Sequence, residues 1–142
     1  MLSIPFFDYT EITENHRVNT EINQLTEQII GAAIEVHREL GPGLLESAYQ
    51  RALAHELRLR GLVFEEQKLC PIKYKDLLAD DAYRLDFLVG GLVVVELKTV
   101  DALLDVHDAQ VLTYLKFTGC RVGLLLNFRS MVLIRGLRRL AL

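Results

Sequence analysis

The sequence contains no tryptophan, only two cysteines and three prolines, and no long hydrophobic run. Cys70 and Cys120 lie far apart and match no metal-binding or redox spacing, so we expect two reduced, partly buried thiols in a cytoplasmic protein. No segment approaches the ~20 apolar residues of a membrane helix, and the N-terminus lacks a basic start followed by an apolar run. The sequence therefore predicts neither a membrane partner nor a secretory signal.

Apolar residues are abundant enough for one folded unit. They make up 51% of the 142 residues, which is typical of a single globular domain with a buried core. The net charge of −3 provides no excess of positive charge for holding polyanions, although a metal-dependent site would bring its own carboxylates to a nucleic-acid substrate. We find neither a glycine-rich phosphate loop of the P-loop kind nor a Ser/His/Asp arrangement. P-loop and serine-hydrolase chemistry therefore have no support in the sequence.

Hydrophobic periodicity and chain breakers predict one mixed α/β (α+β) domain over residues 20–142, with the element order ααβββαββ. No internal repeat or low-complexity tract indicates a second domain. The first expected elements are a helix from Thr20 to Leu40 and a helix carrying Leu45 to Leu57, ended by Gly61 and Leu62. They are followed by an extended stretch Val63–Tyr74 with an edge or bulge at Pro71, a polar connection Lys75–Asp81 and a hairpin Tyr83–Val100. The last are a helix Val106–Thr118, capped by Asp105 and ended by Gly119, a strand Arg121–Leu126 and its partner Met131–Gly136.

Residues 1–19 are predicted to form an N-terminal arm outside this domain. Its apolar side chains, followed by polar residues that discourage a long element, are suited to dock on the arm's own domain or on a neighbouring subunit. A homo-oligomer assembled through the arm is therefore one expectation that the sequence leaves open. The apolar side chains of the arm are Ile4, Phe6, Phe7 and Tyr9.

The expected hairpin, YRLDFLVGGLVVVELKTV, is the most informative stretch of the chain. Asp86, Glu96 and Lys98 interrupt its apolar run, and an unpaired charge inside a sheet is costly unless it is paired, binds a metal or lines a cleft. Glu96 and Lys98 are two residues apart, so they share one face. A two-residue turn at Gly90-Gly91 would turn Asp86 to the opposite face. We expect instead a three-residue loop or a glycine bulge, which places Asp86 and Glu96 on one face.

Two carboxylates on one face of a sheet can bind a hard divalent cation, and Mg²⁺ takes only one or two carboxylates while it keeps several waters. The carbonyl of Leu97 could supply another oxygen, and Lys98 could orient a water or stabilise charge on phosphorus. Glu46, in the first turn of the second expected helix, is either a third carboxylate at this site or simply a favourable first-turn residue. A salt bridge between Glu96 and Lys98 is the structural alternative to the whole site.

Polar side chains also form a stripe on the third expected helix. His107, Gln110 and Tyr114 fall at positions i, i+3 and i+7, where they could position a nucleotide substrate or form a solvated face. Tyr49, three residues after Glu46, is either a further substrate-positioning residue or a core aromatic. The basic residues that could meet phosphates, or belong to a solvated tail, are Arg129, Arg135, Arg138 and Arg139.

Taken together, these stretches resemble the bacterial GxxExxY proteins, a family similar to the PD-(D/E)xK nuclease superfamily. The resemblance runs from about Asn23 to Arg135. It implies a restriction-endonuclease-like core, in which helices flank a mixed β-sheet in the order αβββαβ. The segments that carry it are VHRELGPGLLESAY at Val36–Tyr49, Arg84–Asp86, Val95–Lys98, His107–Gln110, Tyr114–Lys116 and Gly123–Phe128.

The resemblance also implies an activity and a set of roles. The superfamily's Asp, Glu and Lys match Asp86, Glu96 and Lys98, and its helical glutamate matches Glu46. The proline that often precedes the first Asp is absent here. Gln110 and Tyr114 look like the QxxxY element of RecB-like members, and Leu85 occupies the position of the missing proline. The implied function is a Mg²⁺- or Mn²⁺-dependent nuclease acting on DNA rather than RNA. The alternative is a catalytically silent nuclease fold for nucleic-acid binding or self-assembly.

Overall fold

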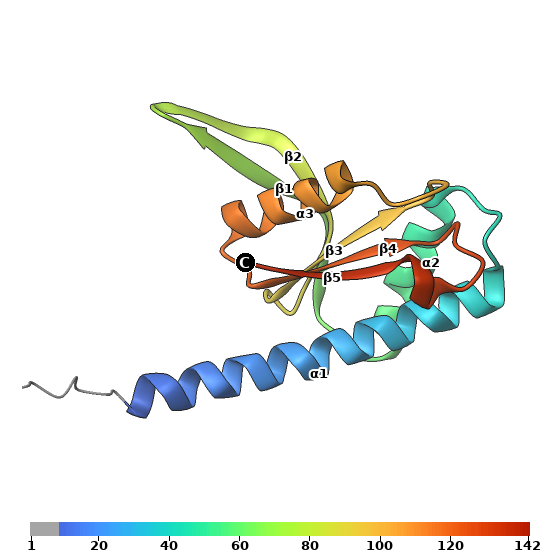
Figure 1. Cartoon of the computed structure of the whole chain (residues 1–142), viewed down its shortest axis with the longest axis horizontal. Coiled ribbons are helices and arrows are strands. Elements are labelled where there is room, and N and C mark those ends of the chain that lie inside the picture. Colours follow the sequence, from blue (N-terminus) through green and yellow to red (C-terminus); the bar gives the residue numbers. More distant parts are fainter. Residues whose placement is uncertain (1–8) are drawn as a thin grey trace, which may run out of the picture.

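The computed structural model describes the backbone of residues 9–142 and the side chains from residue 13 onward. The predicted order ααβββαββ and the mixed α/β class are confirmed, with one short 3-10 helix added (Figure 1). Within this part of the chain no helix is both long and apolar enough to cross a membrane. The elements are α1 (Tyr9–Leu40), α2 (Glu46–Leu59), β1 (Phe64–Tyr74), β2 (Leu77–Val89), β3 (Val93–Lys98), α3 (Asp105–Thr118), β4 (Val122–Asn127), η1 (Leu133–Gly136) and β5 (Leu137–Ala141).

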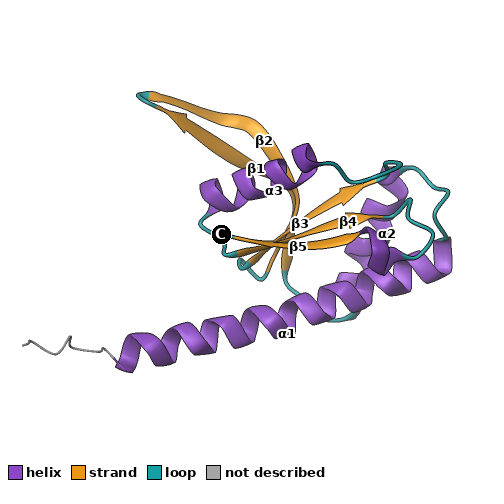
Figure 2. Cartoon of the chain, viewed as in Figure 1, coloured by secondary structure: helices purple, strands orange, loops and turns teal. Residues whose placement is uncertain are grey.

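The five strands form one sheet in the order β1-β2-β3-β4-β5, in which only β3 and β4 run parallel. Helices α1 and α2 cover one face of the sheet, and α3 covers the other (Figure 2). The two faces have separate cores because side chains alternate along the central strands. On β3, Val93 and Val95 pack toward α1 and α2, whereas Val94 packs toward α3.

The turn between β2 and β3 has the predicted three-residue length. Val89 pairs with Val93, so the loop consists of Gly90, Gly91 and Leu92. Both glycines have positive φ angles, 59° and 67°, a conformation that costs a residue with a side chain about 1 kcal/mol or more. The predicted C-terminal caps at Gly61 and Gly119 and the register shift beside Pro71 are confirmed as well.

Helix α1 begins at Tyr9, which is earlier than the predicted start at Thr20. Half of the expected arm is therefore helical, because no proline or glycine lies between Pro5 and Gly31 to end the helix. The division of the chain at residue 20 stays a prediction, although α1 crosses it without a break. The arm residues Ile4, Phe6 and Phe7, and with them the expected docking contact, lie outside the described residues.

Three other boundaries correct the sequence-based prediction. The expected connection Lys75–Asp81 is shorter, because β2 begins at Leu77. Met131–Gly136 is a loop ending in η1, and the partner of β4 is the basic segment β5. That segment can form a strand because its charges are satisfied: Arg138 pairs with Asp108. The residue before α3 is Leu104 rather than a capping Asp105, and the Nδ1 atom of His107 accepts the N–H of Leu104.

Candidate active site

The candidate site lies where the backbone ladder between β2 and β3 stops. The last paired residues are Phe87 and Val95, and one step further the two acidic side chains take over the role of backbone carbonyls. Oε1 of Glu96 accepts the N–H of Asp86 at 2.9 Å, and Oδ2 of Asp86 accepts the N–H of Leu97 at 2.8 Å. Each carboxylate is thus held by the opposite strand, which fixes both in position.

Glu96 lies on the face of the sheet that α3 covers. Val94 belongs to the core on that face, and residues two positions along β3 share it, so Glu96 and Lys98 point to the same side. Asp86 lies beside Glu96, because its N–H donates to the Glu96 carboxylate and its own carboxylate accepts the N–H of Leu97. The predicted juxtaposition of Asp86 and Glu96 is confirmed by this register and by the hydrogen bonds between the strands.

Glu96 is a buried acid with a strongly perturbed pKa. Its side chain is 3% exposed, and burial followed by the charge of Asp86 raises its pKa to about 9, while Lys98 acts in the opposite direction. Such a pair of carboxylates is unfavourable when both are ionised and becomes favourable beside a positive charge. The site is therefore electrostatically suited to receive a cation.

Glu46 is the first residue of α2 and stands within electrostatic reach of the same groups. Partial burial and the charge of Asp86 raise its pKa, and Lys98 lowers it. The cavity between them has a volume of about 280 Å³. Its lining consists of Glu46, Ser47, Gln50, Gln67 and Asp86. The start of α2 thus brings Glu46 to the same cavity as Asp86, and its role as a third carboxylate of the site stays a prediction.

Two glutamines that sequence reasoning missed support Asp86. Gln67 donates a hydrogen bond from Nε2 to Oδ1 of Asp86 at 3.3 Å, and Gln50 donates one from Nε2 to the Asp86 carbonyl at 3.3 Å. Gln67 also has a positive φ angle of 47°, which is uncommon for a residue with a side chain. No spacing in the sequence could have identified either glutamine, because both contacts depend on how β1 and α2 pack against β2.

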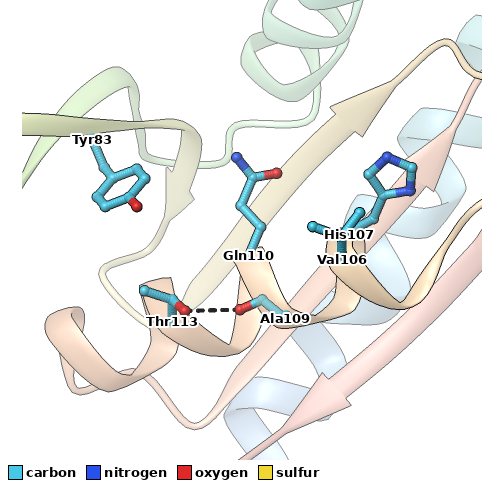
Figure 3. A pocket seen from close by; sticks show the side chains of 6 residues that line it. All are labelled: Tyr83, Val106, His107, Ala109, Gln110 and Thr113. Carbon is cyan, nitrogen blue, oxygen red and sulfur yellow. Dashed lines mark hydrogen bonds between the residues drawn. The ribbon is translucent and has the colours of Figure 1, made fainter.

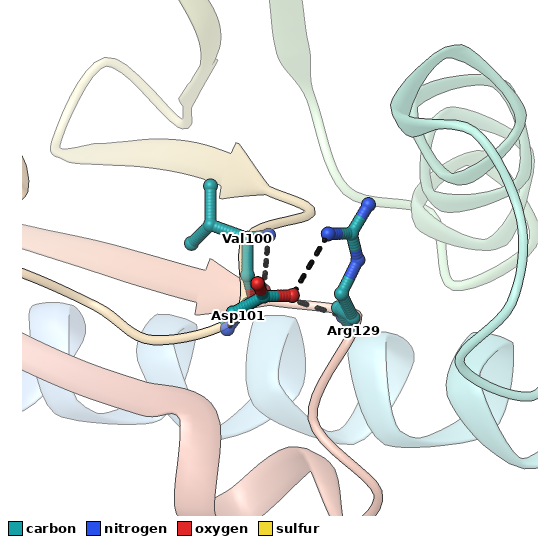
Figure 4. A network of polar contacts seen from close by, with 4 residues as sticks. Val100, Asp101 and Arg129 are labelled. Carbon is teal, nitrogen blue, oxygen red and sulfur yellow. Dashed lines mark hydrogen bonds and ion pairs between the residues drawn. The ribbon is translucent and has the colours of Figure 1, made fainter.

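Lys98 is the last residue of β3 and forms no ion pair within the described part of the chain. The alternative of a Glu96–Lys98 salt bridge is therefore not observed. The chain after Lys98 is fixed by Asn127, whose side-chain amide donates to the Val100 carbonyl at 2.8 Å and accepts the Val100 N–H at 3.1 Å. An ion pair between Asp101 and Arg129 follows immediately (Figure 4). These contacts fix the backbone that follows Lys98, and with it the position of the lysine.

The polar stripe on α3 is partly assembled beside the carboxylates. Gln110 donates from Nε2 to the Tyr114 hydroxyl at 2.9 Å. Tyr114 is buried, and burial followed by the charge of Glu96 raises its pKa to about 12. His107 and Gln110 line a cavity of about 350 Å³ on the same helix, together with Tyr83 of β2, which sequence reasoning did not single out (Figure 3).

Tyr49 occupies the core rather than the site. It is fully buried, stacks on Phe128 at a ring distance of 4.6 Å, and its hydroxyl donates to the Gly41 carbonyl and accepts the Leu44 N–H at 3.1 Å. Of the two alternatives that the sequence left open for Tyr49, its environment is therefore that of a core aromatic. Its physical role is to hold the turn that precedes α2, and with it the start of the helix that carries Glu46.

The four arginines considered as phosphate contacts differ in their partners. Arg129 pairs with Asp101 at 3.2 Å and Arg138 with Asp108 at 2.6 Å. Arg139 donates to Thr26 and Asn23 of α1 at 3.2 and 2.7 Å. Among the described residues, the side chain of Arg135 alone of the four has neither a hydrogen bond nor an ion pair. Arg135 is thus the arginine whose charge is available to a ligand.

The donor set fits a hard divalent cation with few protein ligands. No group of three His, Cys, Asp or Glu side chains within the described residues is placed to hold a metal ion. Asp86 and Glu96 still provide two adjacent carboxylates, which is the number that Mg²⁺ uses when water and phosphate oxygens complete its coordination. Burial, and after it the charge of Asp86, raise the pKa of Glu96, and a bound cation would offset both effects.

Comparison with known proteins agrees with this geometry. The family model described as the PD-(D/E)XK nuclease superfamily matches residues 23–140, which span both carboxylates, the lysine and Glu46. No curated protein and no solved structure matches the chain.

Proposed function

The chain belongs to the PD-(D/E)XK nuclease superfamily, and from this premise we propose that it is a metal-dependent nuclease hydrolysing phosphodiester bonds in DNA rather than RNA. One observation carries the proposal. Asp86 and Glu96 are held together by reciprocal hydrogen bonds to the strand opposite, and Lys98, which forms no ion pair with any described residue, shares the face of Glu96. Assignment to the GxxExxY proteins within the superfamily stays a prediction.

We assign the metal-binding role to Asp86 and Glu96, assisted by the Leu97 carbonyl and by Glu46 directly or through a water. Bound Mg²⁺ or Mn²⁺ would polarise a phosphate oxygen and lower the pKa of an attacking water. The hydrogen bonds from the Asp86 and Leu97 N–H groups restrict the rotation of both carboxylates, so little ordering remains when a ligand arrives. Gln67 and Gln50 restrict Asp86 further.

Lys98 is proposed to act on the water or on the phosphate. Its side chain lies on the same face as that of Glu96 and is not neutralised by an ion pair in the described residues, so its charge remains available. An ammonium donor placed where negative charge develops lowers the barrier. Gln110 and Tyr114, joined by a hydrogen bond, are proposed to position the substrate with His107.

The test is cleavage of supercoiled and linear DNA, with RNA in parallel, in Mg²⁺ and in Mn²⁺. Asp86→Asn retains an oxygen that can accept the Leu97 N–H, and Lys98→Met retains most of the aliphatic chain, so both should fold. Each should reduce cleavage by at least about a hundredfold. The control is Lys73→Met, which removes an exposed lysine from β1 and should leave the rate unchanged.

The catalytically silent alternative predicts a different outcome. If neither metal supports cleavage of DNA or RNA above the level of the Asp86→Asn and Lys98→Met proteins, the nuclease proposal fails. Melting temperatures of all variants, measured in the same buffers, separate loss of folding from loss of chemistry. Stabilisation of the wild type by Mg²⁺ alone would then show whether the carboxylates still bind a cation.

A further inference from the structure

A second cavity opens next to the candidate active site, between β2 and α3. It has a volume of about 350 Å³, at the lower end of the roughly 300–1,000 Å³ range of small-molecule sites. One wall is Tyr83, which extends from β2, and the opposite wall is the exposed side of α3 (Figure 3). The helix contributes Val106, His107, Ala109, Gln110 and Thr113. A ligand of about one nucleotide unit would therefore be enclosed by a strand on one side and a helix on the other.

The described residues that line this cavity include no Lys, Arg, Asp or Glu. A phosphate group in this cavity would lose hydration without gaining an opposite charge, which is unfavourable. A neutral planar group would lose little, because Val106, Ala109 and the methyl group of Thr113 provide apolar surface. The chemistry of the walls thus selects a ring rather than an anion.

Tyr83 supplies an aromatic surface for such a ring. Its side chain is 38% exposed, and it meets Tyr114 at a ring distance of 5.6 Å and an interplanar angle of 72°. Because only part of the Tyr83 ring is covered by this edge-on contact, stacking surface remains accessible from the cavity. Aromatic side chains of this kind bind bases with little sequence preference, since every base has a π face.

Two polar groups on α3 can meet the edge of a base. Gln110 uses one amide N–H for Tyr114, and its second N–H and its carbonyl make no hydrogen bond within the described residues. His107 accepts the Leu104 N–H at Nδ1, so the neutral ring carries its proton on Nε2, where it can donate. Gln110 and His107 therefore offer both hydrogen-bond donors and an acceptor, which matches the edge of a base that carries both kinds of group.

The side chain of Tyr114 lies between this cavity and the carboxylates. Tyr114 contacts Tyr83 and Gln110, which line the cavity, and its hydroxyl is close enough to Glu96 and Asp86 for their charges to raise its pKa. A base in the cavity would thus belong to a nucleotide near the phosphate at the carboxylates. A base inside a duplex is stacked and paired and cannot enter.

We propose that this cavity binds one unpaired nucleobase of a nucleic-acid strand, so that the protein prefers single-stranded or frayed ends over intact duplex. The inference rests on the proposed function for the identity of the polymer. Tyr83 stacks on the base, and Gln110 and His107 hydrogen-bond to its edge.

The test uses the Lys98→Met protein in Mg²⁺, so that binding is measured without cleavage. Fluorescence anisotropy compares a single strand, a blunt duplex and an abasic strand of the same length. Adding Tyr83→Ala should weaken single-strand binding about tenfold and leave duplex and abasic-strand binding within about twofold. Tyr83→Phe should restore most of the affinity, because the ring is kept. Tyr74→Ala, which removes an exposed tyrosine from the same hairpin, should have no effect.

Four results would overturn the inference: no binding to any strand, no effect of Tyr83→Ala, an equal loss for the base-containing and abasic strands, or competition by a nucleoside monophosphate as strong as by the strand. The last would reassign the cavity to a free nucleotide. Cleavage by the wild type is scored separately. Metal-dependent cleavage with no Tyr83 effect would refute this inference alone, whereas a Tyr83-dependent single-strand preference without cleavage would refute the nuclease proposal alone.

Discussion

Glu96→Gln is expected to stabilise the protein at neutral pH, although it removes a residue of the proposed active site. Glu96 is 3% exposed, and burial together with the charge of Asp86 raises its pKa to about 9. Glutamine has nearly the same shape, and its amide oxygen can accept the Asp86 N–H that Oε1 now accepts. The substitution therefore removes the need to protonate this carboxyl on folding, while it leaves the packing and this hydrogen bond in place.

The sign and size of the effect follow from proton linkage. In the unfolded chain the Glu96 carboxyl loses its proton near its ordinary pKa of 4.5, whereas in the folded protein it keeps the proton up to about pH 9. Between these values the folded state binds more protons, so its free energy of unfolding falls as the pH rises. At pH 7 the cost is at most about 3.5 kcal/mol, because this pH lies above the unfolded pKa of 4.5 and each pKa unit corresponds to about 1.4 kcal/mol. Below pH 4.5 this contribution to stability is fully retained.

Urea unfolding of the two proteins at pH 4.5, 7 and 9, in the presence of a chelator, measures the effect. The stability difference should be small at pH 4.5 and should increase with pH. Glu39→Gln, at an exposed position of α1, is the matched control and should show no such increase. A variant that is less stable than the wild type at pH 7, or a difference independent of pH, would show that the Glu96 carboxylate is ionised and well solvated, and the argument would be wrong.

Three further substitutions test the packing of α3 and the basic surface. Gly123→Ala would place a Cβ atom 2.6 Å from Cγ1 of Val111, so α3 must move away from β4, and urea unfolding should show a loss of about 1–3 kcal/mol. Arg135→Ala should weaken nucleic-acid binding and reduce the slope of log affinity against log salt by about one, whereas Arg139→Ala, which loses hydrogen bonds to α1, should lower stability and leave the salt slope unchanged.

The adjacency of the two carboxylates was predictable as far as the length of the loop decides it. Side chains alternate along a regular strand, so the length of the loop at Gly90 decides which residues of β2 and β3 lie opposite each other. Two adjacent glycines tolerate the positive φ angles of a longer loop, and the structure contains this loop. The helix order and most helix ends were predictable for the same local reason, since they depend on periodicity and on glycine caps.

Features that depend on tertiary partners were not predictable. The basic segment with Arg138 and Arg139 resembles a solvated tail, yet it pairs with β4 as β5, and Asp108 and polar residues of α1 bind its arginines. Tyr83 gains its importance from the position of α3, and Gln67 from the packing of β1 on β2. None of these contacts has a fixed sequence spacing, so pattern alone cannot identify them.

The site owes its geometry to a distortion of the sheet rather than to its regular part. Leu85 and Phe87 are two residues apart on β2 and should share a face, yet Leu85 packs on the α3 side and Phe87 on the side of α1 and α2. The change occurs at Asp86, opposite Gln67 with its positive φ angle. Beyond this point the hairpin of β1 and β2 projects from the body of the protein (Figure 1).

This change of the face to which the β2 side chains point, at Asp86, is consistent with three properties of the site. It ends the ladder with β3 after Phe87, which leaves the N–H groups of Asp86 and Leu97 to be satisfied by carboxylates. It places those carboxylates close enough for the charge of Asp86 to raise the pKa of Glu96. It also carries Tyr83 over α3, where the second cavity forms. An undistorted strand pair with identical residues would have backbone partners in place of the carboxylates, and it would hold neither the acidic pair nor the aromatic wall in position.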